Sequence, residues 1–118
     1  MLEKANGKER GTMTERYRVT IQSQMGPREG VLALSYQGSY ITGSLDLVGY
    51  VNTVQGVQAA DGTLHLFHPI QTVVSTIPCE TVLSLYAGRL RGTSTSKSAR
   101  MQWDGTLIRR EPQEESSL

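Results

Sequence analysis

The 118-residue chain lacks the sequence features of disulfide-linked, zinc-binding, membrane-spanning and secreted proteins. Cys79 is its one cysteine, so no disulfide can form within the chain, and one thiol with two histidines supplies too few ligands for a structural zinc site. No apolar run reaches the roughly 18 residues of a membrane-spanning helix. The first ten residues, MLEKANGKER, lack the apolar stretch of a secretory signal. We therefore expect a cytoplasmic protein without a metal or a membrane partner.

The chain also lacks an excess of charge. Its 12 Lys and Arg against 11 Asp and Glu leave a net charge of +1, too small to attract nucleic acid to the molecule as a whole. One segment, GRLRGTSTSKSARM, carries four cations without an acid: Arg89, Arg91, Lys97 and Arg100. Because Trp103 is the one nearby aromatic that could stack on a base, a solvated face is the better interpretation, and no nucleic-acid partner is expected.

What the sequence does contain is the alternation of β-strands. In ERYRVTIQS the apolar side chains of Tyr17, Val19 and Ile21 alternate with polar ones, as in a half-buried strand. The pattern recurs in GVLALSYQG, YITGSLDLV and later segments, between turns that carry glycine. No segment of useful length has helical periodicity. The sequence therefore predicts an all-β protein.

The two halves of the chain align without a gap at a constant offset of 49 residues. Matching pairs include Ile21 with Ile70, Gln22 with Gln71, Gly43 with Gly92, and Gly56 with Gly105. We expect two four-strand repeat units, residues 15–59 and 64–108, that arose by internal duplication. The alternative is that the two halves share only the alternation and the turn residues that are common to β-strand sequences.

Two units of four strands give eight, the number that closes a small barrel. The predicted fold is an eight-stranded antiparallel up-and-down barrel, and a two-sheet β-sandwich fits the same alternation. Gly43 and Gly92 lie on the apolar side of their strands, where a missing side chain permits the bend of a barrel corner. The barrel domain should span residues 15–108, between a disordered arm, 1–14, and a disordered tail, 109–118.

The hairpin-linked strands and the glycine turns QGSYITG and AGRLRG resemble the calycin-like superfamily of lipocalin, fatty-acid-binding and avidin-type barrels. The resemblance is architectural and covers about residues 16–108. It implies an up-and-down barrel with a ligand in its interior. The first strand lacks the Gly-x-Trp of lipocalins, and the one tryptophan, Trp103, lies on the last strand. No binding residue of that family is therefore carried over.

Side chains with catalytic potential are present but are not arranged for catalysis. His65 and His68 point to opposite faces of a strand, so they cannot hold one ion together. Cys79 follows Pro78 without a nucleophile motif and resembles a small buried hydrophobe. No phosphate-binding glycine motif, GxSxG elbow or HExxH is present. We expect no enzyme activity, no catalytic residues and no cofactor.

The predicted binding residues are polar or aromatic groups on the apolar side of their strands. A cavity of apolar walls with a few polar groups is typical of small-molecule sites. We predict four ligand-binding residues: Tyr36, Asn52, His68 and Trp103. The expected apolar lining consists of Leu34, Ile41, Leu45, Leu83 and Leu90. For His68 itself a hydrogen-bonded core role is favoured over ligand contact, and a metal or haem ligand is the third alternative.

The predicted function is a non-catalytic binding protein that holds a small, mainly apolar ligand in the barrel interior, with affinity from apolar burial. The alternative is a self-associating or partner-binding module with no small-molecule ligand. A duplicated unit with pseudo-twofold symmetry suits a homodimer, although such symmetry permits a dimer without requiring one.

Overall fold

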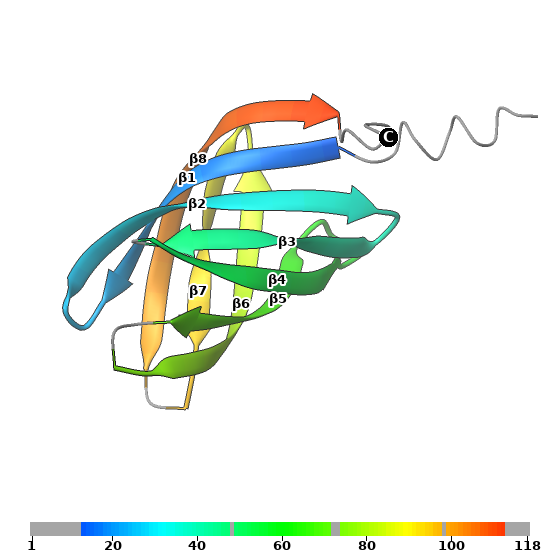
Figure 1. The fold of residues 1–118 in the computed structure, drawn as a ribbon. Coiled ribbons are helices and arrows are strands. Elements are labelled where there is room, and N and C mark those ends of the chain that lie inside the picture. Colours follow the sequence, from blue (N-terminus) through cyan, green and yellow to red (C-terminus); the bar gives the residue numbers. More distant parts are fainter. Residues whose placement is uncertain (1–12, 48, 72–73, 98, 113–118) are drawn as a thin grey trace, which may run out of the picture.

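The computed structural model describes residues 13–47, 49–71, 74–97 and 99–112. They form eight strands: β1 (Met13–Ser23), β2 (Gly26–Gln37), β3 (Tyr40–Leu47), β4 (Tyr50–Gln58), β5 (Leu64–Gln71), β6 (Thr76–Tyr86), β7 (Arg89–Thr95) and β8 (Arg100–Pro112). Each strand pairs with the next in antiparallel fashion, and β8 pairs back with β1 (Figure 1). The predicted closed up-and-down barrel is confirmed, and the sandwich alternative is wrong. The described residues include no helix that could cross a membrane.

The two ends of the barrel differ in what they contain. One end, which we call the near end, holds Met13 and Pro112, which are cross-strand partners, together with the turns around Gly38 and Gly88. We call the opposite end the far end. The far end holds the connections β1–β2, β3–β4, β5–β6 and β7–β8. At the near end Ala87 and Gly88 both have positive φ, of 51° and 79°, which is the backbone of a type I′ hairpin turn.

The middle of the barrel is filled by side chains. The alternation of the strands sends one set of residues inward, and the largest of these expose less than 2% of their surface. They include Val19, Leu32, Leu34, Ile41, Leu45, Val54, Leu64, Leu66, Leu83 and Leu90. All five residues of the expected apolar lining belong to this group. Around them the barrel has the close packing of a protein core.

The hairpin registers of the two halves repeat at the same offset of 49 residues. In the first half the Cα partners are Glu15 with Leu34, Leu34 with Gly43, and Ile41 with Gly56. In the second half they are Leu64 with Leu83, Leu83 with Gly92, and Leu90 with Gly105. Positions 49 apart are therefore structurally equivalent within each unit, while their origin by duplication stays a prediction.

The glycines on the inner side permit close approach of neighbouring strands. A Cβ on Gly43 would overlap the carbonyl oxygen of Ala33, and one on Gly92 would overlap that of Val82. Ala33 and Val82 are themselves 49 residues apart. The same constraint therefore acts at equivalent bends, as expected for barrel corners.

The paired strands extend past the predicted boundaries of the barrel. β1 begins at Met13 rather than residue 15, and β8 continues to Pro112 rather than ending at 108. Cross-strand ion pairs explain the difference, because Arg110 Nε lies 3.0 Å from Glu15 Oε2 and Arg16 Nε lies 3.3 Å from Glu111 Oε2. Polar residues that suggested disorder instead face one another across a ladder. The remaining residues of the predicted arm and tail, 1–12 and 113–118, lie outside the described residues.

Candidate functional site

Three of the four predicted binding residues lie in the far half of the interior. Asn52, His68 and Trp103 are inward-facing and buried, with 6%, 4% and 2% of their surface exposed. The rings of His68 and Trp103 meet edge to face, with centroids 5.7 Å apart. Tyr36 instead lies at the near end, close to the end of β2. The four therefore do not form one site.

A chain of hydrogen bonds links β5, β6, β7 and β8 through this half of the barrel. The indole Nε1 of Trp103 donates to Ser94 Oγ at 2.9 Å. Ser94 Oγ is hydrogen-bonded to Thr81 Oγ1, which lies 2.6 Å from His68 Nε2. Thr81 and Ser94 are both fully buried. Four polar side chains in an apolar interior thus satisfy one another, as buried polar groups must.

These hydrogen bonds fix the tautomer of His68. Its Nδ1 lies 3.2 Å from the carbonyl oxygen of Pro69, which can only accept, so Nδ1 carries the hydrogen. His68 Nε2 then accepts from the Thr81 hydroxyl, and Thr81 in turn accepts from Ser94. Burial lowers the pKa of His68, and the hydrogen bond to Pro69 opposes this shift in part. His68 is therefore a neutral, fully bonded core histidine.

The β4–β5 ladder is short beside this network, and we call its unpaired part the opening. The ladder between β4 and β5 joins only residues 55–58 with 64–67, so residues 50–54 and 68–71 are not paired with each other. The equivalent boundary between β8 and β1, or seam, is paired along β1 from Met13 to Gln22. The opening is therefore specific to one seam and is not required by the fold.

Pro69 explains where the β4–β5 ladder stops. Gln55 pairs with Phe67, and continuing the register would bring Thr53 opposite Pro69, which has no N–H to donate. The equivalent position in the first unit is Thr20, which pairs normally with Asp104 on β8. The Pro69 carbonyl, left without a ladder partner, receives the hydrogen of His68 instead.

Asn52 lies on the β4 side of this opening with an unsatisfied donor. Its Nδ2 is buried and has no hydrogen-bond partner among the described residues. The side chain is inward-facing, between the strand positions of Val51 and Thr53, which point outward. An unpartnered buried amide costs about 1–3 kcal/mol, so this group stands out beside the satisfied His68 network.

Apolar side chains near the opening keep a small accessible surface, unlike those in the middle of the barrel. The exposed fractions are 3% for Leu47, 6% for Ile70 and 9% for Met101, against 0% for Leu45 and Leu66. Arg28 on β2, the cross-strand partner of the buried Ile21, also lies on the inward side of this half. Asn52, with its free donor, thus lies at the same end of the barrel as these three apolar side chains.

The near end holds a separate cluster of polar side chains. Tyr17 donates to Glu15 Oε1 at 2.9 Å, whereas the buried hydroxyl of Tyr36 has no hydrogen-bond partner in the described part of the chain. Burial first, and then the nearby Glu15 carboxylate, raise the pKa of both phenols well above the ordinary range. Tyr36 is thus part of a carboxylate–tyrosine cluster at the opposite end from Asn52.

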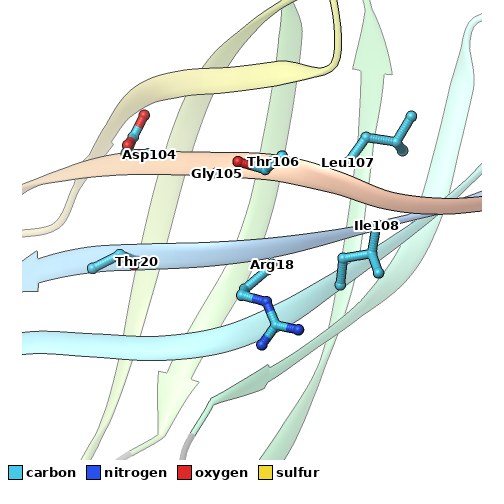
Figure 2. Close-up of a pocket in the computed structure, with 7 residues that line it drawn as sticks. All are labelled: Arg18, Thr20, Asp104, Gly105, Thr106, Leu107 and Ile108. Atoms are coloured by element: carbon cyan, nitrogen blue, oxygen red, sulfur yellow. The ribbon is translucent and has the colours of Figure 1, made fainter.

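A groove with a volume of about 540 Å³ lies on the outer surface along β1 and β8 (Figure 2). Its lining consists of Arg18, Thr20, Asp104, Gly105, Thr106, Leu107 and Ile108. Asp104 lies 3.3 Å from Arg89 Nη2 and 3.5 Å from Arg91 Nε, so it neutralises part of the basic segment predicted above. The groove is on the opposite side of the wall from His68 and Asn52 and is not continuous with them.

The remaining candidate groups stay apart. His65 faces the other side of β5 from His68, as predicted, and Cys79 is buried with its thiol 3.6 Å from the Ile77 carbonyl oxygen. Burial raises the pKa of the Cys79 thiol, which disfavours the reactive thiolate. No group of three His, Cys, Asp or Glu that could hold a metal occurs among the described residues.

Thr81 and Pro69 are missing from the predicted site residues, although the sequence contains a signal for each. Thr81 lies between Cys79 and Leu83 in the alternation of β6, which places it inward. Pro69 interrupts a strand pattern, and a proline inside such a pattern indicates an unpaired edge. Neither signal says which partners the fold would bring to it.

Comparisons with models of protein families, with curated proteins and with solved structures find no match to this chain. The closed eight-stranded architecture is compatible with a calycin-like fold. The functional argument therefore depends on the site itself.

Proposed function

We propose that this barrel is a non-catalytic binding protein for a small, uncharged and mainly apolar molecule that carries a hydrogen-bond acceptor. The ligand would enter at the far end through the opening between β4 and β5. The observation that carries the proposal is the buried Nδ2 of Asn52, which has no partner among the described residues. A ligand oxygen that accepts from this amide would remove its desolvation penalty.

The chemistry around Asn52 limits the class of ligand. The neighbouring His68 network satisfies its own donors and acceptors, so the amide is the group left to orient a ligand. Leu47, Ile70 and Met101 supply apolar contact, worth about 25 cal/mol for each Å² that the ligand buries. Leu47, Ile70 and Met101 carry no charge, so a charged group in contact with them would pay heavily for desolvation.

The proposed position differs from the central one expected from the sequence. Leu34, Leu45 and Leu83 have no accessible surface, so a ligand in contact with them would require the packed core to rearrange. Ile70 and Met101 at the far end keep a small accessible surface, 6% and 9%, which favours ligand contact there. The proposal therefore keeps the interior site but moves it to the unpaired seam.

A fluorescence titration tests the proposal, because Trp103 is the one tryptophan and belongs to the network beside the site. We expect 1-decanol to change its emission saturably, and decanoate, with the same chain length but a charge, to bind far more weakly. Asn52→Leu should weaken binding of the alcohol by about tenfold, the loss of one buried hydrogen bond. Thr53→Val, on the outer side of the same strand, is the control and should bind normally.

Native mass spectrometry of the protein purified from its own host complements the titration. A retained neutral small molecule that is released on denaturation supports the proposal. Equal affinity of the wild-type protein and the Asn52→Leu variant for every alcohol would exclude the Asn52 site. Saturable binding of decanoate with no binding of 1-decanol would exclude the neutral class of ligand.

The second candidate function is the interaction module. The observation that favours it is a group of large apolar side chains on the outside of the barrel, among them Tyr40 and Phe67, which are 69% and 51% exposed. Solvated strands normally carry polar residues at outward positions.

A further inference from the structure

The outer surface over β3 to β6 carries an apolar face, formed by Tyr40, Val57, Phe67 and Val82. Their side chains are 69%, 41%, 51% and 44% exposed. The ladders make them neighbours: Tyr40 pairs with Val57, Val57 with His65, and His65 with Val82. Phe67 lies two residues along β5 from His65, on the same side of the strand. Four adjacent strands thus present apolar side chains to solvent around His65, which lies between Val57 and Val82.

The other half of the barrel shows that the fold does not need an apolar face at these positions. The residues equivalent to Tyr40, Val57 and Phe67, at the offset of 49, are Arg89, Thr106 and Arg18. Thr106 pairs with Arg89 on one side and with Arg18 on the other, so these three also form one surface, the arginine face. It includes the groove of Figure 2. Two equivalent surfaces therefore carry opposite chemistry.

We propose that the apolar face is the interface of a homodimer, in which the same face of two copies meets across a twofold axis. An axis that passes near Val57 would place Phe67 of each copy against Tyr40 of the other. Large aromatic side chains at the centre of an interface supply most of the binding energy. Gln55 and Glu80, the cross-strand partners of Phe67, would form part of the polar rim.

The distribution of charge favours a second copy in this orientation. Contact of the apolar face with the arginine face of another copy would bury Arg18 and Arg89 against apolar groups, at a large desolvation cost. The isologous arrangement instead leaves both arginine faces on the outside of the dimer, far apart. It also closes after two copies, whereas the head-to-tail contact would continue into a ring or a filament.

The test is sedimentation velocity of the full chain over a range of concentrations. We expect the wild-type protein to associate into a dimer and no further. Phe67→Arg and Val57→Thr introduce the residues found at the equivalent positions of the arginine face, and both suit exposed strand sites. We expect Phe67→Arg to raise the dissociation constant at least about tenfold, as for a central aromatic anchor, and Val57→Thr to raise it less.

Arg18→Gln on the opposite side of the barrel is the matched control and should dimerise as the wild type does. Far-UV circular dichroism confirms that each variant keeps its strands, and Val57→Thr retains a β-branched residue in case Phe67→Arg does not fold. A wild-type protein that stays monomeric at every concentration overturns the proposal. A dimer that both apolar-face variants leave unchanged, or a species that grows beyond two copies, also overturns it.

Discussion

Pro69 on β5 lies directly opposite Pro78 on β6. Neither residue can donate, so this must be a non-hydrogen-bonded pair of the antiparallel ladder, in which the backbone groups of each residue point away from the partner strand. The carbonyl of Pro69 therefore points toward β4, where no N–H is paired with it. The opening beside Asn52 and the hydrogen bond from His68 both follow from this one pair.

Replacing Pro69 should close the seam. Pro69→Thr introduces the residue found at the equivalent position 20, and it restores an N–H that can pair with Thr53. We expect slower hydrogen exchange at the backbone amide of Thr53 than in the wild type, and protection of the new amide at residue 69, both measured by nuclear magnetic resonance. Pro78→Thr is the control, because its backbone groups face away from β4. Unchanged exchange in the Pro69→Thr variant would show that something other than the missing donor holds the seam open.

Removing the unpartnered amide should stabilise the ligand-free protein. Asn52→Leu has a similar volume and no buried polar atom, so we expect the free energy of unfolding to rise by about 1–2 kcal/mol in urea titrations. A decrease would mean that the carboxamide is already satisfied, for example by an ordered water. The same variant should lose the proposed ligand, so stability and binding change in opposite directions at this residue.

Thr81 is the residue on which the interior network depends. Thr81→Val keeps the shape but leaves His68 Nε2 without a donor and Ser94 without an acceptor, at a cost of about 1–3 kcal/mol. Thr81→Ser retains the hydroxyl and loses one methyl group, so it should cost about 1 kcal/mol through the cavity alone. Urea unfolding of both variants separates the network from the packing. Equal losses would indicate that the hydrogen bonds contribute nothing.

Stability should depend on pH through His68. Its folded pKa is lowered chiefly by burial, so the unfolded chain takes up a proton that the folded chain resists. The stability is therefore complete above the unfolded pKa of about 6.5 and falls as the pH drops below it, by at most about 1.4 kcal/mol for each pH unit. His68→Gln should remove this fall, whereas His65→Gln should keep it. Urea titrations between pH 5 and 8 would decide, and an unchanged slope in His68→Gln would contradict the assignment.

The two near-end tyrosines should respond in opposite ways to loss of the hydroxyl. Tyr36→Phe removes a buried group without a hydrogen bond and should stabilise by about 1 kcal/mol, while Tyr17→Phe breaks the bond to Glu15 and should destabilise by a similar amount. Because both pKa values are raised in the folded state, stability is present below about pH 10 and lost above it. Thermal unfolding of the two variants at neutral and alkaline pH measures both the mutational effects and the loss of stability above about pH 10. Melting-temperature shifts of the same sign for Tyr36→Phe and Tyr17→Phe would contradict the opposite effects expected of them.

The fold was largely predictable because its signals are local. Alternation at Tyr17, Val19 and Ile21 and the turn glycines determine strand number and order, and these the structure confirms. The strand ends were less predictable. Glu15 and Arg110 look like solvated charges in isolation, and their pairing becomes visible only when β1 and β8 are adjacent.

The site was harder to predict than the fold. Inward positions of Asn52, His68 and Trp103 follow from alternation, but which of them meet depends on the stagger of strands around the barrel. Tyr36 has the same local pattern as the others, yet the direction of β2 carries it to the near end. The unpaired seam could not be predicted from Pro69 alone, because a proline does not reveal which neighbouring strand loses its partner.

Pairing of Met13 with Pro112 has a consequence for how the protein folds. The β1–β8 ladder joins the two ends of the described sequence, whereas every other ladder joins strands next to each other along the chain. Its loop-closure entropy is therefore the largest, and the closing ladder should form last, in the slow step of refolding. During synthesis β1 must wait with one edge unpaired until β8 has left the ribosome. In that interval the nascent sheet is exposed to aggregation through its open edge.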